Sequence, residues 1–286
     1  MIPFRKILFP VDYSTRCETV VPYVKETARR FKADLTLVHA YAPDPLAYRQ
    51  FSVGEPDLMT AARLNEERRL QQYALETFPG EHVEYFAELG EAGSVIANVI
   101  QRQGTDLVML ATHGRGPFRR LLLGSVAAKV LHDIGAAVWT GVGSDLQDHA
   151  PQIPYKSVLC ALDDSDEAEG VMTAAAALAC DYQARLRLVH VVEMPPATFE
   201  VDFAPYRKDL IDAADFRLRE LKGRLDLNVP HEVIDAPVAD GVRDEALRRK
   251  ADLIIIGRGR VQGTFSRIWS NVYPIVRESP CPVLSI

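Results

Sequence analysis

Short apolar runs alternate with longer amphipathic stretches along the whole chain, and this alternation predicts strands and helices in turn. In the first half, strands are predicted near 5–11, 34–40, 82–88, 106–111 and 137–142. The stretches between them predict helices over about 17–32, 57–78, 91–103 and 124–133. Such an order is typical of a parallel sheet covered by helices.

The second half follows the same order, with strands predicted near 156–162, 185–191, 231–236, 252–257 and 282–286. The runs Leu107-Val108-Met109-Leu110 and Leu253-Ile254-Ile255-Ile256 are apolar on both faces, as in strands buried between two helix layers. We therefore predict an α/β fold with two tandem open parallel five-stranded sheets, each with helices on both faces in a Rossmann-like arrangement.

The two halves also repeat one another in sequence. The first predicted strand ends in Asp12-Tyr13-Ser14, and 151 positions later the chain reads Asp163-Asp164-Ser165. At the same offset, Leu35–His39 returns as Leu186–His190. A repeat of this length fits one complete α/β domain, because solenoid units are far shorter.

The repeat predicts domains over 1–143 and 154–286, joined by a polar, proline-punctuated linker over 144–153. Proline-rich segments over 42–56 and 194–205 each follow a second strand, at the sheet edge where α/β proteins bind ligands. They are either lids or plain surface connections.

Pro22 either kinks the first helix or marks its first turn.

Composition narrows the classes of function. The net charge of −6 argues against nucleic-acid binding, which needs a basic surface. No apolar run approaches the roughly 20 residues that cross a bilayer. The four cysteines form no Cys-x-x-Cys pair, as expected for reduced, mostly buried thiols. The residues before the first strand leave no room for a signal peptide. We expect a soluble cytoplasmic protein without a membrane partner.

The strongest indication of chemistry follows the fourth strand, over Ala111–Ser125. Glycines in this loop let backbone N–H groups approach a phosphate, and the following helix start adds unpaired donors. Ser125 either donates its hydroxyl to the ligand or caps the helix. Asp12 would lie nearby and accept hydrogen bonds from a sugar hydroxyl. Arg115, Arg119 and Arg120 either clamp phosphates or form a solvated face.

This arrangement resembles the universal stress protein family, whose phosphate motif is Gly-x-x-Gly, nine residues, then Gly-Ser or Gly-Thr. Gly114, nine residues, Gly124 and Ser125 fit this motif, whereas Ala111 stands where the first glycine belongs. The resemblance extends to the Val11-Asp12-x-Ser14 opening and the Ser279–Leu284 close. It implies a tandem member with an adenine-nucleotide α-hydrolase-like fold.

In nucleotide-binding members, the first strand's aspartate and backbone at the second strand's end hold ribose and adenine. The resemblance therefore implies a site for ATP, ADP or AMP, with or without Mg2+, in the first half. Its residues would be Pro10, Asp12, Ala40, Ala111, His113, Gly114, Arg115, Gly124 and Ser125. If position 111 needs a positive φ, its Cβ costs on the order of 1 kcal/mol.

The second half departs further from the motif. Gly257 takes the first glycine position, but Arg260 replaces the second, and Ser270-Asn271 replaces Gly-Ser. Bulky residues at these positions should block the usual phosphate pose, although arginines could contact an anion differently. We expect Asp163 to persist as a turn cap and the second half to act as a structural partner.

Three functions remain open from the sequence: a nucleotide-binding stress or signalling protein, an interaction module with a vestigial pocket, and a weak nucleotide hydrolase. No Ser-His-Asp order or metal cluster is evident, and the resemblance implies binding before catalysis. His39 and His190 recur at strand ends, where backbone hydrogen bonds would hold them. We expect the halves to form a pseudo-dimer through Ala137–Val142 and Pro282–Ile286, with or without a further homodimer.

Overall fold

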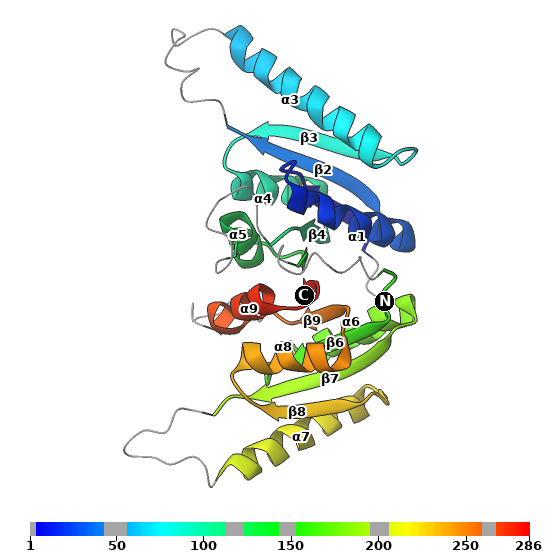
Figure 1. Ribbon diagram of the computed structural model, residues 1–286, viewed down its shortest axis with the longest axis vertical. Helices are drawn as coiled ribbons and strands as arrows, with labels where there is room; N and C mark the ends of the chain where they lie inside the picture. Colours follow the sequence, from blue (N-terminus) through cyan, green and yellow to red (C-terminus); the bar gives the residue numbers. More distant parts are fainter. Residues whose placement is uncertain (1–3, 43–55, 113–122, 143–152, 195–205, 259–266) are drawn as a thin grey trace, which may run out of the picture. The chain divides into compact units, whose positions relative to one another are not determined.

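A computed structural model describes residues 4–42, 56–112, 123–142, 153–194, 206–258 and 267–286, without the side chains of 56–59 and 267–270. These residues fall into two compact units, the first within 3–143 and the second within 144–286. Each unit is an α/β fold with a parallel sheet, as the sequence predicted (Figure 1). Residues 144–152, 43–55 and 195–205, which make up nearly all of the linker and of both proline-rich segments, lie outside the described residues.

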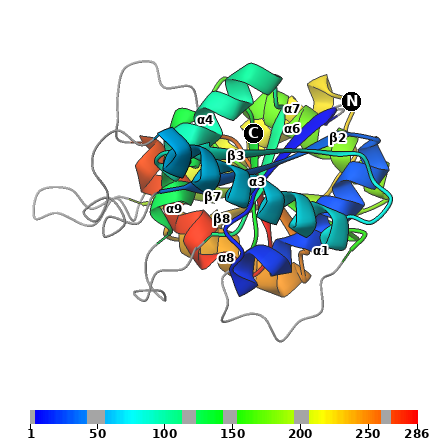
Figure 2. The ribbon, with the colours of Figure 1, turned by 90° about the horizontal axis from the view of Figure 1, so that it is seen from above.

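The first unit has five described strands in the spatial order β3-β2-β1-β4-β5. They are β1 (Lys6–Pro10), β2 (Asp34–Tyr41), β3 (Val83–Leu89), β4 (Leu107–Leu110) and β5 (Ala137–Thr140). The described helices are α1 (Thr15–Phe31), α3 (Pro56–Thr77), α4 (Ala92–Gln103) and α5 (Ser125–Asp133). Right-handed crossovers place α1 and α3 on one face and α4 and α5 on the other. Figure 2 shows α1 and α4 on opposite sides of the strands.

The second unit repeats this topology in the order β10-β9-β6-β7-β8. Its strands are β6 (Ser157–Leu162), β7 (Arg185–Val192), β8 (His231–Asp235), β9 (Leu253–Ile256) and β10 (Val283–Ser285). Its described helices are α6 (Ala168–Tyr182), α7 (Arg207–Arg224), α8 (Val238–Arg249) and α9 (Arg267–Glu278). Every residue of β4 and of β9 is buried, which explains their unbroken apolar sequences.

An aspartate before the fourth strand fastens the amino end of each sheet. The Asp106 carboxylate accepts hydrogen bonds from the backbone N–H groups of Arg5 and Lys6, at 2.8 and 3.2 Å. Asp252 accepts the corresponding bonds at 2.7 and 3.0 Å. These carboxylates satisfy backbone donors at the start of the first strand, so their repetition is structural.

Pro22 lies in the interior of α1, so the alternative that it marks the first turn is wrong. The helix begins at Thr15, where Ser14 is the N-cap and its side chain accepts from the backbone N–H of Cys17. The start of α1 is therefore fixed by the residues that follow β1.

Candidate functional site

The carboxyl ends of β1 and β2 leave one backbone position open toward a ligand. The N–H of Val11 donates to the carbonyl of Val38 at 2.8 Å, the last such bond between these segments. Because alternate residues of a parallel strand direct their backbone groups to the same neighbour, the N–H and C=O of Ala40 face the same side of β2 as those of Val38. This position lies beyond the end of β1. No backbone hydrogen bond joins Ala40 to that side within the described residues. Pro10, the last residue of β1, is half-buried beside it.

Asp12 is half-buried directly after this strand end. Its Oδ1 accepts from the N–H and the Oγ–H of Ser14, at 2.9 and 2.6 Å. For Oδ2 the described part of the chain supplies no hydrogen-bond partner. One oxygen therefore fixes the turn into α1, and the other can accept a hydrogen bond from a ligand.

The other side of the site is built by the end of β4 and the start of α5. The N–H of Gly124 donates to the carbonyl of Thr112 at 2.8 Å, which closes the ends of the intervening loop. Gly124 is the N-cap of α5, and Ser125 is its exposed first residue. The alternative that Ser125 caps the helix is therefore wrong. Its hydroxyl and the first helical N–H groups remain suited to an anion.

Sheet pairing brings the two sides together, because β1 pairs with β2 on one side and with β4 on the other. Six of the predicted site residues thus lie together at one sheet edge: Pro10, Asp12, Ala40, Ala111, Gly124 and Ser125. His113, Gly114 and Arg115 lie outside the described residues. Ala111 is not among the residues with positive φ, so the condition for backbone strain at this position is not met.

A contact that sequence reasoning missed fastens α5 to α4. Glu91 is the N-cap of α4, and its carboxylate accepts from the N–H groups of Gly93 and Ser94, both at 2.9 Å. Lys129, one turn beyond Ser125, places Nζ 2.9 Å from Glu91 Oε2. Bonding to Lys129, Gly93 and Ser94 lowers the pKa of Glu91 to about 2. The helix that begins at the candidate phosphate site is thereby held in place.

We expect Glu91→Gln to lower the free energy of unfolding by less than about 1 kcal/mol, because the pair is exposed. A depressed carboxylate pKa stabilises the fold above the ordinary value of 4.5, and this stabilisation is lost as the pH falls toward 2. Urea unfolding of both proteins at pH 7 and in steps below 4.5 checks this. A difference that stayed constant with pH would contradict a charge-based origin.

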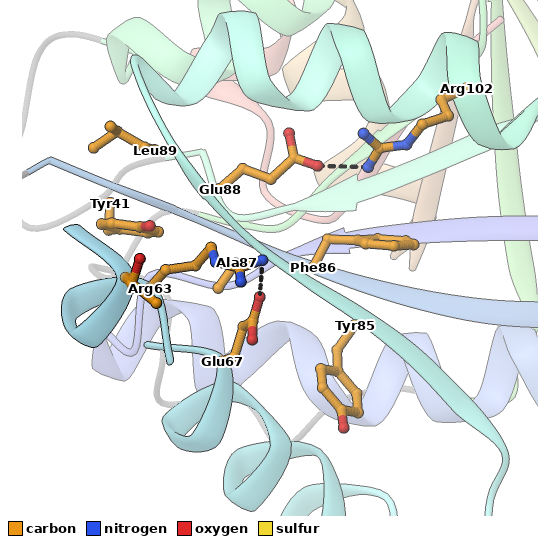
Figure 3. A pocket seen from close by; sticks show the side chains of 10 residues that line it. Tyr41, Arg63, Glu67, Tyr85, Phe86, Ala87, Glu88, Leu89 and Arg102 are labelled. Carbon is orange, nitrogen blue, oxygen red and sulfur yellow. Dashed lines mark hydrogen bonds and ion pairs between the residues drawn. The ribbon is translucent and has the colours of Figure 1, made fainter. Parts of the chain in front are cut away.

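A groove of about 660 Å3 runs beside β3 (Figure 3). Residues from both faces of β3 line it, with Arg63 of α3 on one side and Arg102 of α4 on the other. Arg63 pairs with Glu67 and Arg102 with Glu88. None of the six described candidate residues lines this groove, so it is separate from the predicted nucleotide site.

The second unit differs from the first at each phosphate position that can be compared. A Cβ on Gly257 would lie 2.9 Å from Cγ2 of Val171, so this glycine allows close packing of β9 against α6. Asn271, the counterpart of Ser125, is the fifth residue of α9, where the N–H groups belong to the helix interior. The free helix start of the first unit is therefore absent from this position.

Arg258, the counterpart of Thr112, carries charge where the first unit has a hydroxyl. Burial lowers the pKa of Arg258, and attraction to Glu167 opposes this shift. Asp163 does persist as a turn cap, accepting from the N–H and Oγ–H of Ser165 at 3.1 and 2.5 Å. The second unit thus keeps the turn but places an arginine and an acid near the sheet edge.

The repeated histidines are held by the backbone, as expected. His39 donates Nδ1–H to the carbonyl of Val11 at 2.7 Å, and His190 does the same to the carbonyl of Leu162 at 3.0 Å.

Three of the four free cysteines are buried, and burial raises the pKa of Cys17 to about 12. Among the described residues, no helix has the length and apolar character to span a membrane. Nor do those residues gather three metal-binding side chains.

Comparison with known proteins identifies the family. The model of the universal stress protein family matches residues 3–140 and again 154–286. The chain therefore belongs to the universal stress protein family, in a tandem two-domain form. It is 32% identical over 139 residues to a universal stress protein of Thermus aquaticus, covering 46% of this chain and 98% of that protein.

Solved structures share the fold. A universal stress protein from Archaeoglobus fulgidus superimposes with a TM-score of 0.70 at 18% identity, covering 98% of this chain and 97% of its own. Another universal stress protein, solved in complex with cAMP, covers 46% of this chain and 97% of its own, at 18% identity and a TM-score of 0.34. The first of these supports the fold, and the second carries no weight for the ligand of this chain.

Proposed function

We propose that this protein binds one adenine nucleotide, ATP, ADP or AMP, in its first unit, and acts in the cytoplasm in stress response or signalling. The observation that carries the proposal is the pairing of two features across β1. One is the open Oδ2 of Asp12, and the other is the free helix start at Gly124 and Ser125. A carboxylate accepts hydrogen bonds from ribose hydroxyls, whereas a helix start attracts phosphate.

Each part of a nucleotide then has a partner of suitable chemistry. The N–H and C=O of Ala40 can pair with the edge of the base, beside Pro10. The phosphates would extend toward Ser125 and the loop that contains His113, Gly114 and Arg115. A Mg2+ ion would arrive with the phosphates, because the described residues offer no carboxylate cluster to hold it alone.

The second unit serves in this proposal as a structural partner. Its helix α9 begins too early to offer N–H groups at the position of Ser125, and Arg258 with Glu167 occupies the neighbourhood. We further propose that the units form a pseudo-dimer through β5 and β10. In support, each is an apolar strand at one end of its own unit's sheet, and such edges favour pairing.

Calorimetric titration of the intact chain with ATP, ADP, AMP and GTP tests the function. We expect binding of the adenine nucleotides and weaker binding of GTP, since the N–H and C=O of Ala40 match the N1 acceptor and N6–H donor of adenine, whereas guanine presents a donor and an acceptor in the reverse order. Absence of heat with every adenine nucleotide would contradict the proposal and favour an interaction module. Phosphate release after addition of ATP and Mg2+ would favour the hydrolase.

A further inference from the structure

The loop that carries Asp12 holds a tyrosine in an unfavourable backbone conformation. Tyr13 has a φ of 57°, in the left-handed region. That conformation costs a residue with a Cβ roughly 1–2 kcal/mol, so surrounding contacts must hold it. Because Tyr13 directly follows Asp12, the contacts that hold its ring also set the direction of the Asp12 carboxylate.

The Tyr13 ring is held on several sides. The guanidinium carbon of Arg69 lies 4.0 Å from the ring centroid, a cation–π contact. The ring centroids of His39 and Tyr73 lie 4.7 and 5.5 Å away. These contacts come from β2 and from α3, so they fix the ring against two separate elements. We refer to Tyr13, His39, Glu66, Arg69 and Tyr73 as the tyrosine clamp.

The three members of the clamp from α3 are Glu66, Arg69 and Tyr73, whose spacing of three and then four residues places them on one helix face. Oε2 of Glu66 lies 3.8 Å from Nε2 of His39 and 3.7 Å from Nη1 of Arg69. The hydroxyl of Tyr73 donates to Oε1 of Glu18 at 2.8 Å. Helix α3 therefore contacts β2, the Asp12 loop and the helix α1 that follows this loop.

The second unit repeats this contact with different chemistry. Asp164 stands in place of Tyr13, and Arg217 of α7 donates to it from Nε and Nη2, at 3.1 and 2.9 Å. Asp164 is not among the residues with positive φ. An arginine of the long helix thus contacts the residue after the aspartate in both units. The strained backbone occurs in the first unit, which has the open helix start.

We propose that Arg69 is a positioning residue of the nucleotide site, which orients Asp12 toward the ribose by holding the Tyr13 ring. This inference rests on the proposed function. Arg69 does not touch the nucleotide, and loss of its side chain lets Tyr13 leave the left-handed conformation and turn the Asp12 carboxylate away. The loss of affinity should then be confined to the ribose hydroxyls.

The test compares the affinities of the intact chain for ATP and for 2′,3′-dideoxy-ATP, which lacks the hydroxyls that Asp12 would bind. We expect Arg69→Ala to weaken ATP binding about 5- to 10-fold and dideoxy-ATP binding by less than about twofold, because the change misdirects the Asp12 carboxylate without removing it. Arg69→Lys, which keeps a cation over the ring, should restore the discrimination. Arg68→Ala, an exposed neighbour, should leave both affinities unchanged.

A double-mutant cycle strengthens the test. In an Asp12→Asn background, Arg69→Ala should cause no further loss of ATP affinity, because both changes remove the same contact. If Arg69→Ala left the ratio of the ATP affinity to the dideoxy-ATP affinity unchanged, whether or not both affinities fell, the positioning role would be overturned even though ATP binds. A wild-type chain with no affinity for ATP would overturn the proposed function and, with it, the role of the clamp.

Discussion

Replacing Gly124 with glutamate is expected to lower the affinity for ATP by at least about 100-fold, equivalent to about 2.7 kcal/mol. The substituted carboxylate would stand at the start of α5, where the proposal puts the phosphates, and like charges repel strongly at short range. The fold should persist, because Gly124 has φ −59° and ψ 143°, a conformation that any residue adopts. Calorimetric titration measures the affinity, and the melting temperature reports the fold.

Two control variants separate charge from bulk. Gly124→Ala adds a Cβ without charge and should cost much less affinity than glutamate. Asn271→Glu places the same charge at the Ser125 position of the second unit and should leave ATP binding unchanged. Wild-type affinity in Gly124→Glu would contradict the assignment of the phosphate site.

For Asp12→Asn we expect a loss of ATP affinity of about 10- to 100-fold, in line with a hydrogen bond to a charged group. The asparagine carbonyl can still accept the two bonds that Ser14 now donates to Oδ1, so the cap of α1 should survive. What changes is Oδ2, which becomes an NH2 group and can no longer accept from a ribose hydroxyl. Titration with ATP and with 2′,3′-dideoxy-ATP measures this effect.

The matched control is Asp163→Asn, which alters the equivalent turn of the second unit and should leave both affinities unchanged. In Asp12→Asn the two nucleotides should bind with nearly equal affinity. Retention of wild-type discrimination by that variant would show that Asp12 does not bind the ribose.

Much of the fold could be predicted from sequence because its main determinants are local. The apolar sequences of β4 and β9 identify buried strands wherever they occur. Because the sequence repeats, each of these patterns can be read in both units. The roles of Asp106 and Asp252 could not be predicted, since each closes hydrogen bonds to backbone about 100 residues earlier.

In the candidate site, too, some residues could be predicted from the sequence and others could not. Gly124 and Ser125 could be proposed because a spacing motif along the chain identifies them, and Asp12 because it directly follows the first predicted strand. The clamp was missed because Arg69 and Tyr13 are separated by more than 50 residues, and their contact depends on where α3 lies over the sheet. The left-handed backbone of Tyr13 gave no indication either, since tyrosine rarely adopts it.

Native mass spectrometry of the intact chain with ATP tests most directly whether the first unit holds the working site. We expect one adenine nucleotide per wild-type chain, none on Gly124→Glu, and one on Asn271→Glu. Two nucleotides per wild-type chain, or one nucleotide that persists on Gly124→Glu and disappears on Asn271→Glu, would contradict a single site in the first unit.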